Sequence, residues 1–322
     1  MSESAALRIV VFADPEGGPP PDPEMLAPLA AFGSVEVYPE PPATPVKRLE
    51  AARGAHVIIN AAPLAWGYRL LSQLPELRML SLGSVGTDMV NLDAARELGV
   101  TVAHQGGNTA PIVAEHEFAL LLAASKRLGF HTAEIRAGRW TRRETVYLAG
   151  KRLGVIGTGN TGSRMAQLAR AIGMEVVAWS FHPGEEKARA LGLRYVELDE
   201  LLVSSDAVSL HVASSTETRG MIGREQFARM KRGAILVNGS RGDVVDTDAL
   251  VEALRSGHLG AAGLDVFDPE PLPADHPLRT LEQVVLSPHI ADNNPEGHAF
   301  MLGDAVANAV AFLKGSPQSV VT

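Results

Sequence analysis

The chain has 322 residues, of which 46% are hydrophobic and 20% charged, enough for about two globular domains with sizeable cores. It contains no cysteine, which excludes disulfides, thiolate metal sites and cysteine nucleophiles and fits a reducing compartment. The net charge of −8 argues against nucleic acid or an anionic membrane as a general partner. Residues 1–6 lack a targeting pattern, and no apolar run approaches the ~20 residues of a membrane span, so we expect a cytoplasmic protein.

Short β-like runs in the first third of the chain predict a small α/β domain. They cover residues 7–12, 35–38, 56–59, 79–82 and 100–103, and a proline-rich loop is expected at 17–23. A largely apolar helix follows at 109–128, where Glu115, His116 and Glu117 make a membrane span implausible. Helical segments alternate with the β-like runs, which predicts a mainly parallel, doubly wound sheet.

A second set of β-like runs predicts a second domain. They begin at residue 153 and continue at 175–179, 207–210, 234–237, 261–264 and 284–287. A final helix at 301–314 has no strand partner of its own, so we expect it to return to the first domain. The predicted fold class is α/β with two doubly wound parallel-sheet domains. The substrate domain comprises residues 1–103 plus 291–322, and the cofactor domain comprises residues 104–290.

The most specific motif is the run Leu-Gly-Val-Ile-Gly-Thr-Gly-Asn-Thr-Gly at residues 153–162, an apolar strand that leads into a glycine turn and a helix. Gly157 permits the tight turn, Gly159 lets a pyrophosphate approach the backbone, and Gly162 lets the helix pack against the strand. The partial positive charge at the helix N-terminus would face the phosphates. This setting predicts a dinucleotide-binding site, and a purely structural glycine turn is the alternative.

Three polar residues, Arg241, Glu270 and His289, each follow a predicted strand of the second domain by a few residues. Ligands of open parallel sheets bind beyond the carboxyl ends of the strands, and all three residues fall at that edge. Taken singly, they have plain alternatives: a solvated loop arginine, a turn carboxylate between two prolines, and a packing histidine. Their joint occurrence at the edge that carries the glycine turn favours a catalytic site.

These side chains suit hydride transfer between a nicotinamide cofactor and a 2-keto acid. The coenzyme supplies the hydride, so the protein must hold the carboxylate, polarise the carbonyl and deliver one proton. The planar guanidinium of Arg241 matches a carboxylate. The imidazole of His289 can protonate the forming alkoxide, and a nearby Glu270 would favour imidazolium and raise its pKa. This chemistry needs no metal.

Several stretches that span most of the chain occur together in one order: residues 113–116, 154–162, 236–245, 263–271 and 287–290. In this combination the chain resembles the D-isomer-specific 2-hydroxyacid dehydrogenases, in a glyoxylate or hydroxypyruvate reductase-like short form without a regulatory domain. The resemblance implies that Arg241, Glu270 and His289 form the catalytic set. It also implies a Rossmann cofactor domain inserted into a flavodoxin-like substrate domain, and a homodimer formed through the cofactor domain.

The resemblance places further residues at the two ligands. The loop at 83–86 corresponds to the family's contact with the substrate carboxylate, and Asp265 corresponds to the aspartate that holds the nicotinamide amide. Substrate contacts are thus expected at Ser84, Val85, Gly86, Arg241 and His289. Cofactor contacts are expected at Gly157, Thr158, Gly159, Asn160, Thr161, Gly162, Ser180, His182, His211, Val212, Thr218, Gly239, Ser240, Asp265 and His289.

The choice of coenzyme depends on the end of the second cofactor strand. NAD-preferring relatives carry an acidic residue there, which accepts from the ribose 2′-hydroxyl, whereas this chain has Ser180. Ser180 has no charge to repel a 2′-phosphate and His182 is a nearby candidate cation, so NADP is slightly favoured over NAD. After His289 the family commonly has small residues and a threonine, but here Asp292, Asn293 and Asn294 follow. The sequence is therefore also compatible with an unusual substrate.

Two other functions remain compatible with the sequence. A dinucleotide-sensing protein, like the corepressors that share this fold, is disfavoured because sensing needs no acid–base pair. A dehydrogenase acting on another small anion, such as formate or phosphite, is the other alternative. Glu270 counts against formate, because formate dehydrogenases of this superfamily carry glutamine at that position.

The expected ligands are small molecules. A metal site at Glu115, His116 and Glu117 is not expected, because adjacent helical residues face different directions. The expected partner is a small 2-keto or 2-hydroxy acid of the glyoxylate or hydroxypyruvate type, with no nucleic acid and no membrane.

Overall fold

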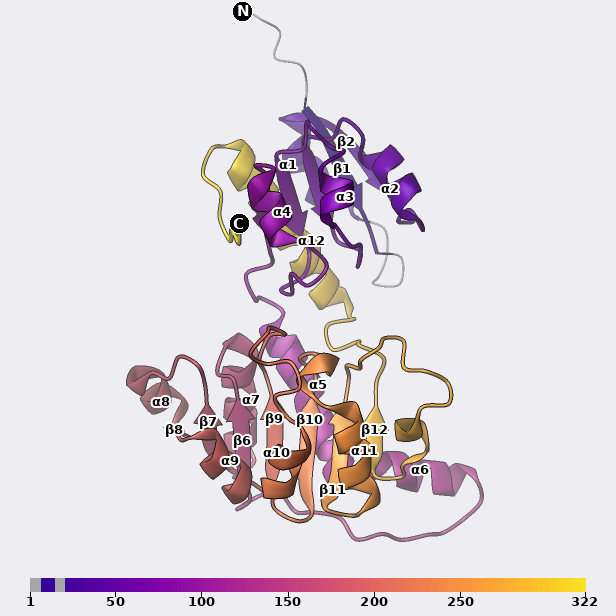
Figure 1. The fold of residues 1–322 in the computed structure, drawn as a ribbon, viewed down its shortest axis with the longest axis vertical. Coiled ribbons are helices and arrows are strands. Elements are labelled where there is room, and N and C mark those ends of the chain that lie inside the picture. Colours follow the sequence, from indigo (N-terminus) through magenta and orange to yellow (C-terminus); the bar gives the residue numbers. More distant parts are fainter. Residues whose placement is uncertain (1–6, 15–20) are drawn as a thin grey trace, which may run out of the picture. The chain divides into compact units, whose positions relative to one another are not determined.

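The computed structural model describes residues 7–14 and 21–322 (Figure 1). Residues 1–6, on which the targeting expectation rests, and residues 17–20 of the predicted proline-rich loop lie outside the described residues. The chain divides into two compact units. Unit 1 comprises Met1–Thr109 and Asp292–Thr322, and unit 2 comprises Ala110–Ala291. The chain therefore leaves unit 1 after Thr109 and returns to it at Asp292.

Unit 1 is built on a five-stranded sheet in the order β2-β1-β3-β4-β5, the flavodoxin-like arrangement. All neighbouring strands pair in parallel. The strands are β1 (Leu7–Phe12), β2 (Gly33–Tyr38), β3 (Val57–Asn60), β4 (Met79–Leu82) and β5 (Thr101–Ala103). The helices are α1 (Pro23–Ala30), α2 (Pro45–Ala52), α3 (Tyr68–Leu71), α4 (Leu92–Glu97) and α12 (Pro295–Leu313).

Apolar layers cover both faces of this sheet, because successive side chains of a strand point to opposite faces. Ile9 and Val11 of β1 pack in one layer with residues of α1 and α12. Val10 and Phe12 pack in the other layer with residues of α2, α3 and α4. The Ser81 hydroxyl donates a 2.8 Å hydrogen bond to a carbonyl of α12. The last helix of the chain is thus part of the core of unit 1.

Unit 2 is built on a seven-stranded parallel sheet in the order β12-β11-β10-β9-β6-β7-β8, a Rossmann order extended by one strand. The strands are β6 (Arg152–Ile156), β7 (Glu175–Trp179), β8 (Arg194–Tyr195), β9 (Ala207–Leu210), β10 (Ala234–Asn238), β11 (Leu259–Leu264) and β12 (Val284–Leu286). The helices are α5 (Ala110–Ser125), α6 (Leu128–Arg136), α7 (Asn160–Ala171), α8 (Glu185–Leu191), α9 (Leu198–Ser204), α10 (Arg224–Arg229), α11 (Thr247–Arg255) and two 3₁₀ helices, η1 (Gly242–Val244) and η2 (Pro277–Thr280).

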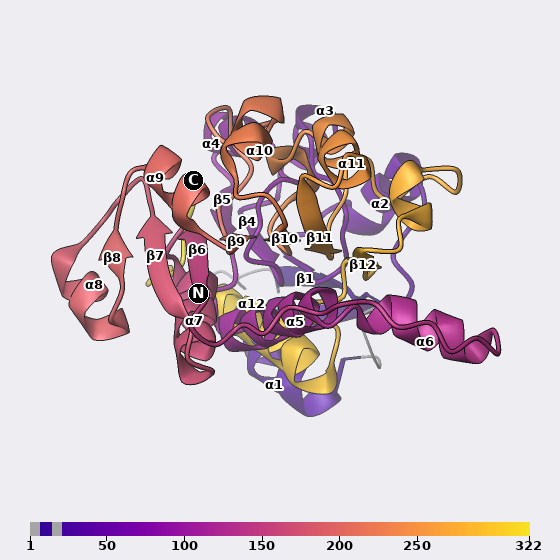
Figure 2. The ribbon, with the colours of Figure 1, turned by 90° about the horizontal axis from the view of Figure 1, so that it is seen from below.

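Helices cover both faces of the sheet in unit 2. In Figure 2, α5 and α7 lie on one side of it and α10 and α11 on the other. Buried residues of α5 and α7 pack on β6 and β10, and those of α9, α10 and α11 form the opposite layer. The predicted fold class, α/β with two doubly wound parallel sheets, is confirmed.

Two predicted helices differ from the observed ones. The helix expected at 109–128 ends at Ser125, because Arg127 adopts a left-handed backbone with φ of 50° before α6 begins. The helix expected at 301–314 begins instead at Pro295. The Asn294 side chain accepts a 2.8 Å hydrogen bond from the N–H of Gly297, and Pro295 occupies the first helical position, where proline is favoured. The prediction followed the apolar residues and missed this cap.

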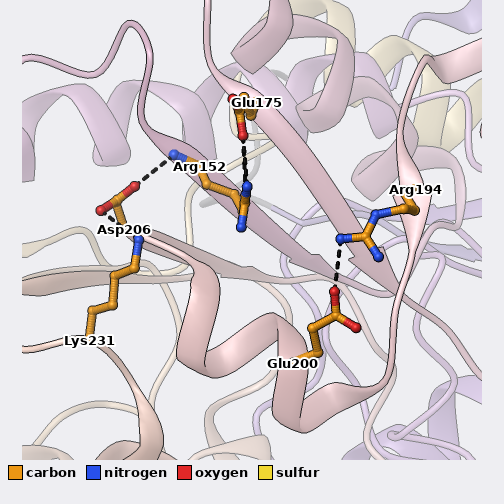
Figure 3. Close-up of polar contacts among 6 residues, drawn as sticks. All are labelled: Arg152, Glu175, Arg194, Glu200, Asp206 and Lys231. Carbon is orange, nitrogen blue, oxygen red and sulfur yellow. Dashed lines mark hydrogen bonds and ion pairs between the residues drawn. The ribbon is translucent and has the colours of Figure 1, made fainter.

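The amino ends of β6, β7 and β8 carry a group of ion pairs (Figure 3). Arg152 contacts Glu175 at 2.9 Å, and Arg194 contacts Glu200 at 2.8 Å. Lys231 contacts Asp206 at 3.1 Å. A cavity of about 540 Å³ is lined in part by Arg152, Glu175 and Arg194, but it lies at the opposite edge of the sheet from the glycine turn. Arg152 and Arg194 are engaged with glutamates, and Arg170 donates to the carbonyl of Leu191. Exposed ion pairs of this kind contribute little to stability.

Within the described residues, no helix has both the length and the apolar character needed to cross a membrane. The same part of the chain contains no group of three or more His, Asp or Glu side chains arranged to bind a metal ion.

We expect Asn294→Ala to lower the free energy of unfolding by about 0.5–2 kcal/mol, because it removes the N-cap of α12, a core helix of unit 1. Urea-induced unfolding measures the change. Asn294→Ser restores a capping oxygen and should recover most of the loss. Equal stability of Asn294→Ala and the natural protein would show that the cap does not stabilise α12.

Candidate active site

The glycine turn after β6 is fixed by the protein's own backbone at two positions. Gly157 has a φ of 92°, and a side chain there would begin 2.5 Å from the carbonyl oxygen of His211. A side chain at Gly162 would begin 2.0 Å from the carbonyl oxygen of Gly157. The turn therefore requires glycine at both positions whether or not a ligand is bound.

Gly159 differs from these two glycines. A side chain at Gly159 would meet no heavy atom of the described residues within 4 Å. Gly159 is also the N-cap of α7, and among the described residues no side chain caps that helix. The backbone at the start of α7 is therefore open to an anion, and its first N–H groups have the orientation and partial charge to bind one. The residues present fit the pyrophosphate of a dinucleotide.

His289 and Glu270 form the central polar contact at the carboxyl edge of this sheet. Nδ1 of His289 lies 2.8 Å from Oε2 of Glu270, and both side chains are partly exposed. The hydrogen bond that His289 donates to Glu270 raises the pKa of His289 above its ordinary value, although burial opposes this. Burial disfavours the charged form of Glu270, but hydrogen bonds from His289 and from the N–H of Phe267 lower its pKa. The imidazolium–carboxylate state is thus favoured.

Asp265 holds the backbone that carries His289. Its carboxylate is fully buried and accepts hydrogen bonds from the N–H groups of Ile290 at 3.1 Å and Ala291 at 3.0 Å. Its carbonyl accepts the N–H of His289 at 2.7 Å. His289 has a φ of 53°, a strained conformation for a residue with a side chain, so surrounding contacts must hold it in place. Burial opposes ionisation of Asp265, but hydrogen bonds from His116 and Ser287 help to lower its pKa.

Arg241 lies between β10 and η1, next to the other two predicted residues. Asn238, at the end of β10, donates through Nδ2 to the carbonyl of Arg241 at 2.9 Å and accepts from the N–H of Ser240 at 3.0 Å. A side chain at Gly242 would begin 2.0 Å from the backbone of Phe267, so the loops of Arg241 and Glu270 pack together. The positive charge of Arg241 lowers the pKa of His289, against the effect of Glu270. The structure thus brings the predicted trio together.

The expected cofactor contacts fall into two groups in the structure. Gly159 and Asn160 are exposed at the turn, while His182 is exposed beyond β7 and Ser180 is partly exposed there. Other side chains are occupied within the protein: the hydroxyl of Thr218 donates to the carbonyl of Ala213. The side chain of His211 is 1% exposed and contacts Glu117. Residues of this second group can meet a ligand only through their backbone.

The expected substrate loop belongs to unit 1. Ser84, Val85 and Gly86 follow the carboxyl end of β4, and Ser84 and Val85 are exposed. The Ser84 hydroxyl donates to the carbonyl of Gly86 at 2.7 Å, and Nδ1 of His104 lies 2.9 Å from the carbonyl oxygen of Val85. The loop therefore presents a defined backbone conformation.

Sequence reasoning missed several residues that shape this edge of unit 2. Lys187 of α8 donates to the carbonyl of Thr158 in the glycine turn at 2.9 Å. Asn238 fixes the backbone of the Arg241 loop. From α5, His116 contacts the loops after β11 and β12, and Glu117 contacts the loops after β9 and β10. No local signal marks Lys187 or Asn238, because their roles depend on contacts made in the folded chain.

We expect Gly162→Ala to destabilise the protein by about 1–3 kcal/mol, because the new methyl group would overlap the turn backbone.

Gly159→Ala should leave stability unchanged but weaken dinucleotide binding, because its methyl group would occupy the open backbone surface. Urea-induced unfolding and calorimetric titration with NADH and NADPH measure the two effects. Normal binding by Gly159→Ala would contradict the placement of the pyrophosphate.

Comparisons with known proteins show the family to which the chain belongs. Residues 118–291 match the family model described as "D-isomer specific 2-hydroxyacid dehydrogenase, NAD binding domain". A glyoxylate reductase of Aeropyrum pernix is 39% identical over 303 residues, covering 91% of this chain and 90% of that protein. A hydroxypyruvate reductase of Blautia hydrogenotrophica is 33% identical over 303 residues, covering 91% of this chain and 93% of that protein.

A solved structure extends the likeness to the whole fold. The crystal structure of a glyoxylate reductase from Paecilomyes thermophila has a TM-score of 0.90 and 27% identity, with 98% of each chain covered. The predicted family is thereby confirmed. The chain belongs to the D-isomer specific 2-hydroxyacid dehydrogenase family and is an oxidoreductase that uses a nicotinamide cofactor.

Proposed function

We propose that the protein reduces a small 2-keto acid of the glyoxylate or hydroxypyruvate type to the D-2-hydroxy acid. The observation that carries this proposal is the 2.8 Å contact between His289 and Glu270, at the sheet edge that also carries Arg241 and the glycine turn. The relatives named glyoxylate reductase and hydroxypyruvate reductase support the substrate class.

In the proposed reaction, each member of the trio has a separate task. Arg241 binds the substrate carboxylate through its planar guanidinium and polarises the adjacent carbonyl. Nδ1 of His289 is held by Glu270, so Nε2 is the nitrogen that delivers a proton to the carbonyl oxygen. The family resemblance assigns a second contact with the carboxylate to the loop formed by Ser84, Val85 and Gly86. When bound, the coenzyme supplies the hydride for the substrate carbon.

We propose that the dinucleotide lies along the carboxyl edge of the sheet in unit 2. The turn from Gly157 to Gly162 holds the pyrophosphate, and Val212, Gly239, Ser240 and Asp265 lie toward the nicotinamide end. His211, Thr218 and Asp265 contribute through their backbone, because their side chains are engaged elsewhere.

The weak preference for NADP gains support from charge near the end of β7. Ser180 brings no negative charge there, and His182 is exposed beside it. Lys187 places an ammonium group against the carbonyl of Thr158, which adds positive charge beside the turn. A 2′-phosphate would be attracted by such charge, whereas a 2′-hydroxyl would gain little.

We further propose that the protein is a homodimer in the cytoplasm, with unit 2 forming the interface. Several large apolar side chains on and after α6 are exposed in the single chain: Leu128, Ile135, Trp140 and Tyr147. Large apolar side chains exposed in one segment of the chain favour an interaction site there. The absence of cysteine fits a reducing compartment.

A turnover assay tests the proposal against its alternatives. Oxidation of NADH and NADPH at 340 nm is followed with glyoxylate, hydroxypyruvate and other 2-keto acids, and phosphite oxidation is followed in the reverse direction. We expect turnover with the small 2-keto acids. Coenzyme binding without any turnover would favour the sensing alternative, and activity on phosphite alone would favour the other dehydrogenase.

We expect kcat/KM for keto-acid reduction to fall as pH rises through the pKa of His289, because only the protonated ring can donate a proton. Glu270 raises that pKa, so Glu270→Gln should move the falling limb to lower pH. The pH profile at saturating coenzyme measures the shift. Glu282→Gln, at an exposed ion pair elsewhere in unit 2, is the control and should not move the limb. A Glu270→Gln limb at the same or higher pH would refute the pairing.

We expect Arg241→Lys to raise KM for the keto acid by about 10–100-fold, because a forked charge-assisted hydrogen bond is lost. The affinity for NADH and NADPH should change less than about twofold. Steady-state kinetics and coenzyme titration measure the two quantities. Arg229→Lys, at a surface pair with Asp199, serves as the control. An unchanged KM in Arg241→Lys would rule out the carboxylate assignment.

A further inference from the structure

Helix α5 places two adjacent polar side chains, His116 and Glu117, against the loops at the carboxyl edge of unit 2. The side chain of His116 is 22% exposed and that of Glu117 only 1% exposed. As neighbours on a helix they face different directions, and in the structure they reach different loops. Neither residue has a part in the chemistry proposed above.

His116 contacts the support of the catalytic histidine. Its Nε2 lies 3.0 Å from the hydroxyl of Ser287 and 3.3 Å from Oδ1 of Asp265. The Ser287 hydroxyl donates its single proton to Asp265 at 2.6 Å, so Nε2 of His116 must be the donor to Ser287. The carbonyl of Asp265 in turn accepts a hydrogen bond from the N–H of His289, whose backbone is strained. The carboxylate of Asp265 accepts a hydrogen bond from the N–H of Ile290. His116 therefore ends a chain of hydrogen bonds that leads to His289.

Glu117 contacts a separate set of loops. Its Oε2 lies 2.9 Å from Nδ1 of His211, an ion-pair distance without hydrogen-bond geometry, and neither atom has a hydrogen-bond partner in the described part of the chain. Nε2 of His211 lies 2.9 Å from the hydroxyl of Ser209. A side chain at Gly239 would begin 2.6 Å from Oε1 of Glu117, so the carboxylate lies directly against the loop that follows β10.

The buried pair also supports the glycine turn. The carbonyl oxygen of His211 is the atom nearest to a side chain built at Gly157, and the Cβ of His211 lies beside Gly162. A displacement of His211 would therefore shift the backbone of the glycine turn. Loss of one member of a buried pair leaves the other polar group without compensation, so replacement of Glu117 should displace or destabilise His211.

We propose that His116 and Glu117 are positioning residues that act on separate parts of the reaction. His116 fixes the proton donor through Ser287 and Asp265, and Glu117 fixes the coenzyme-binding loops through His211 and Gly239. This division rests on the function proposed above, because it assigns His289 to proton transfer and the glycine turn to the coenzyme. One helix thereby sets both parts of the site.

The test compares leucine variants, which remove the polar group, with glutamine variants, which return a hydrogen-bonding group. His116→Leu should lower kcat for keto-acid reduction about tenfold and move the pH limb of His289, with coenzyme Kd unchanged within about twofold. Glu117→Leu should raise the Kd of NADH and NADPH about tenfold, with kcat at saturating coenzyme and the pH limb unchanged. His116→Gln and Glu117→Gln should each recover most of the corresponding loss.

The pH readout is specific because the charged groups that face His289 are left in place. These are Glu270, Asp265 and Arg241. A general loss of structure would lower the unfolding temperature and reduce both quantities together. If a leucine variant does not fold, Ser287→Ala tests the His116 branch and Ser209→Ala tests the Glu117 branch, with the same expected division.

Three outcomes bear on the proposal. A division of effects between kcat and coenzyme Kd supports it. Equal effects of the two variants on both quantities, or lower stability with normal kinetics, would overturn it. If the natural protein itself fails to reduce any 2-keto acid, the proposed function fails first, and that result is separate from any comparison of variants.

Discussion

The contact between His289 and Glu270 is the interaction on which the site depends. An imidazole alone would titrate near neutral pH, but a carboxylate at hydrogen-bond distance stabilises its protonated form. The pKa values of the two groups move apart, which leaves one as a proton donor and the other as a fixed counter-charge. Such a pair is useful only if its orientation is held. The loops at the carboxyl edge of the sheet in unit 2 hold His289 and Glu270 in that orientation.

The support comes from buried polar groups rather than from the apolar core alone. Asp265 is fully buried, yet its carboxylate accepts two backbone N–H groups and a serine hydroxyl. A buried carboxylate is costly unless its hydrogen bonds are made, and here they tie the loop after β12 to the end of β11. The parallel sheet brings the ends of its strands to one edge, and the polar contacts fix the loops that extend from it.

The sequence allowed the main chemical groups to be predicted because their signals are local. The glycine turn has a fixed spacing, and Arg241 and His289 follow strands that their apolar composition reveals. The helix boundary at Pro295 depended on the Asn294 cap, a local signal that was overlooked in favour of the apolar pattern. The buried state of His211 could not be predicted, because it depends on Glu117, which is distant in sequence. Contacts of that kind exist only after the sheet has formed.

The most direct test of the account is the pKa of the His289 ring, measured by NMR titration of histidine-labelled protein. The signal is assigned by its loss in His289→Asn. The account predicts a pKa above the ordinary histidine value of 6.5, because Glu270 stabilises the charged ring. A pKa at or below that value would show that the carboxylate does not hold the proton on His289, and would contradict its assignment as the acid.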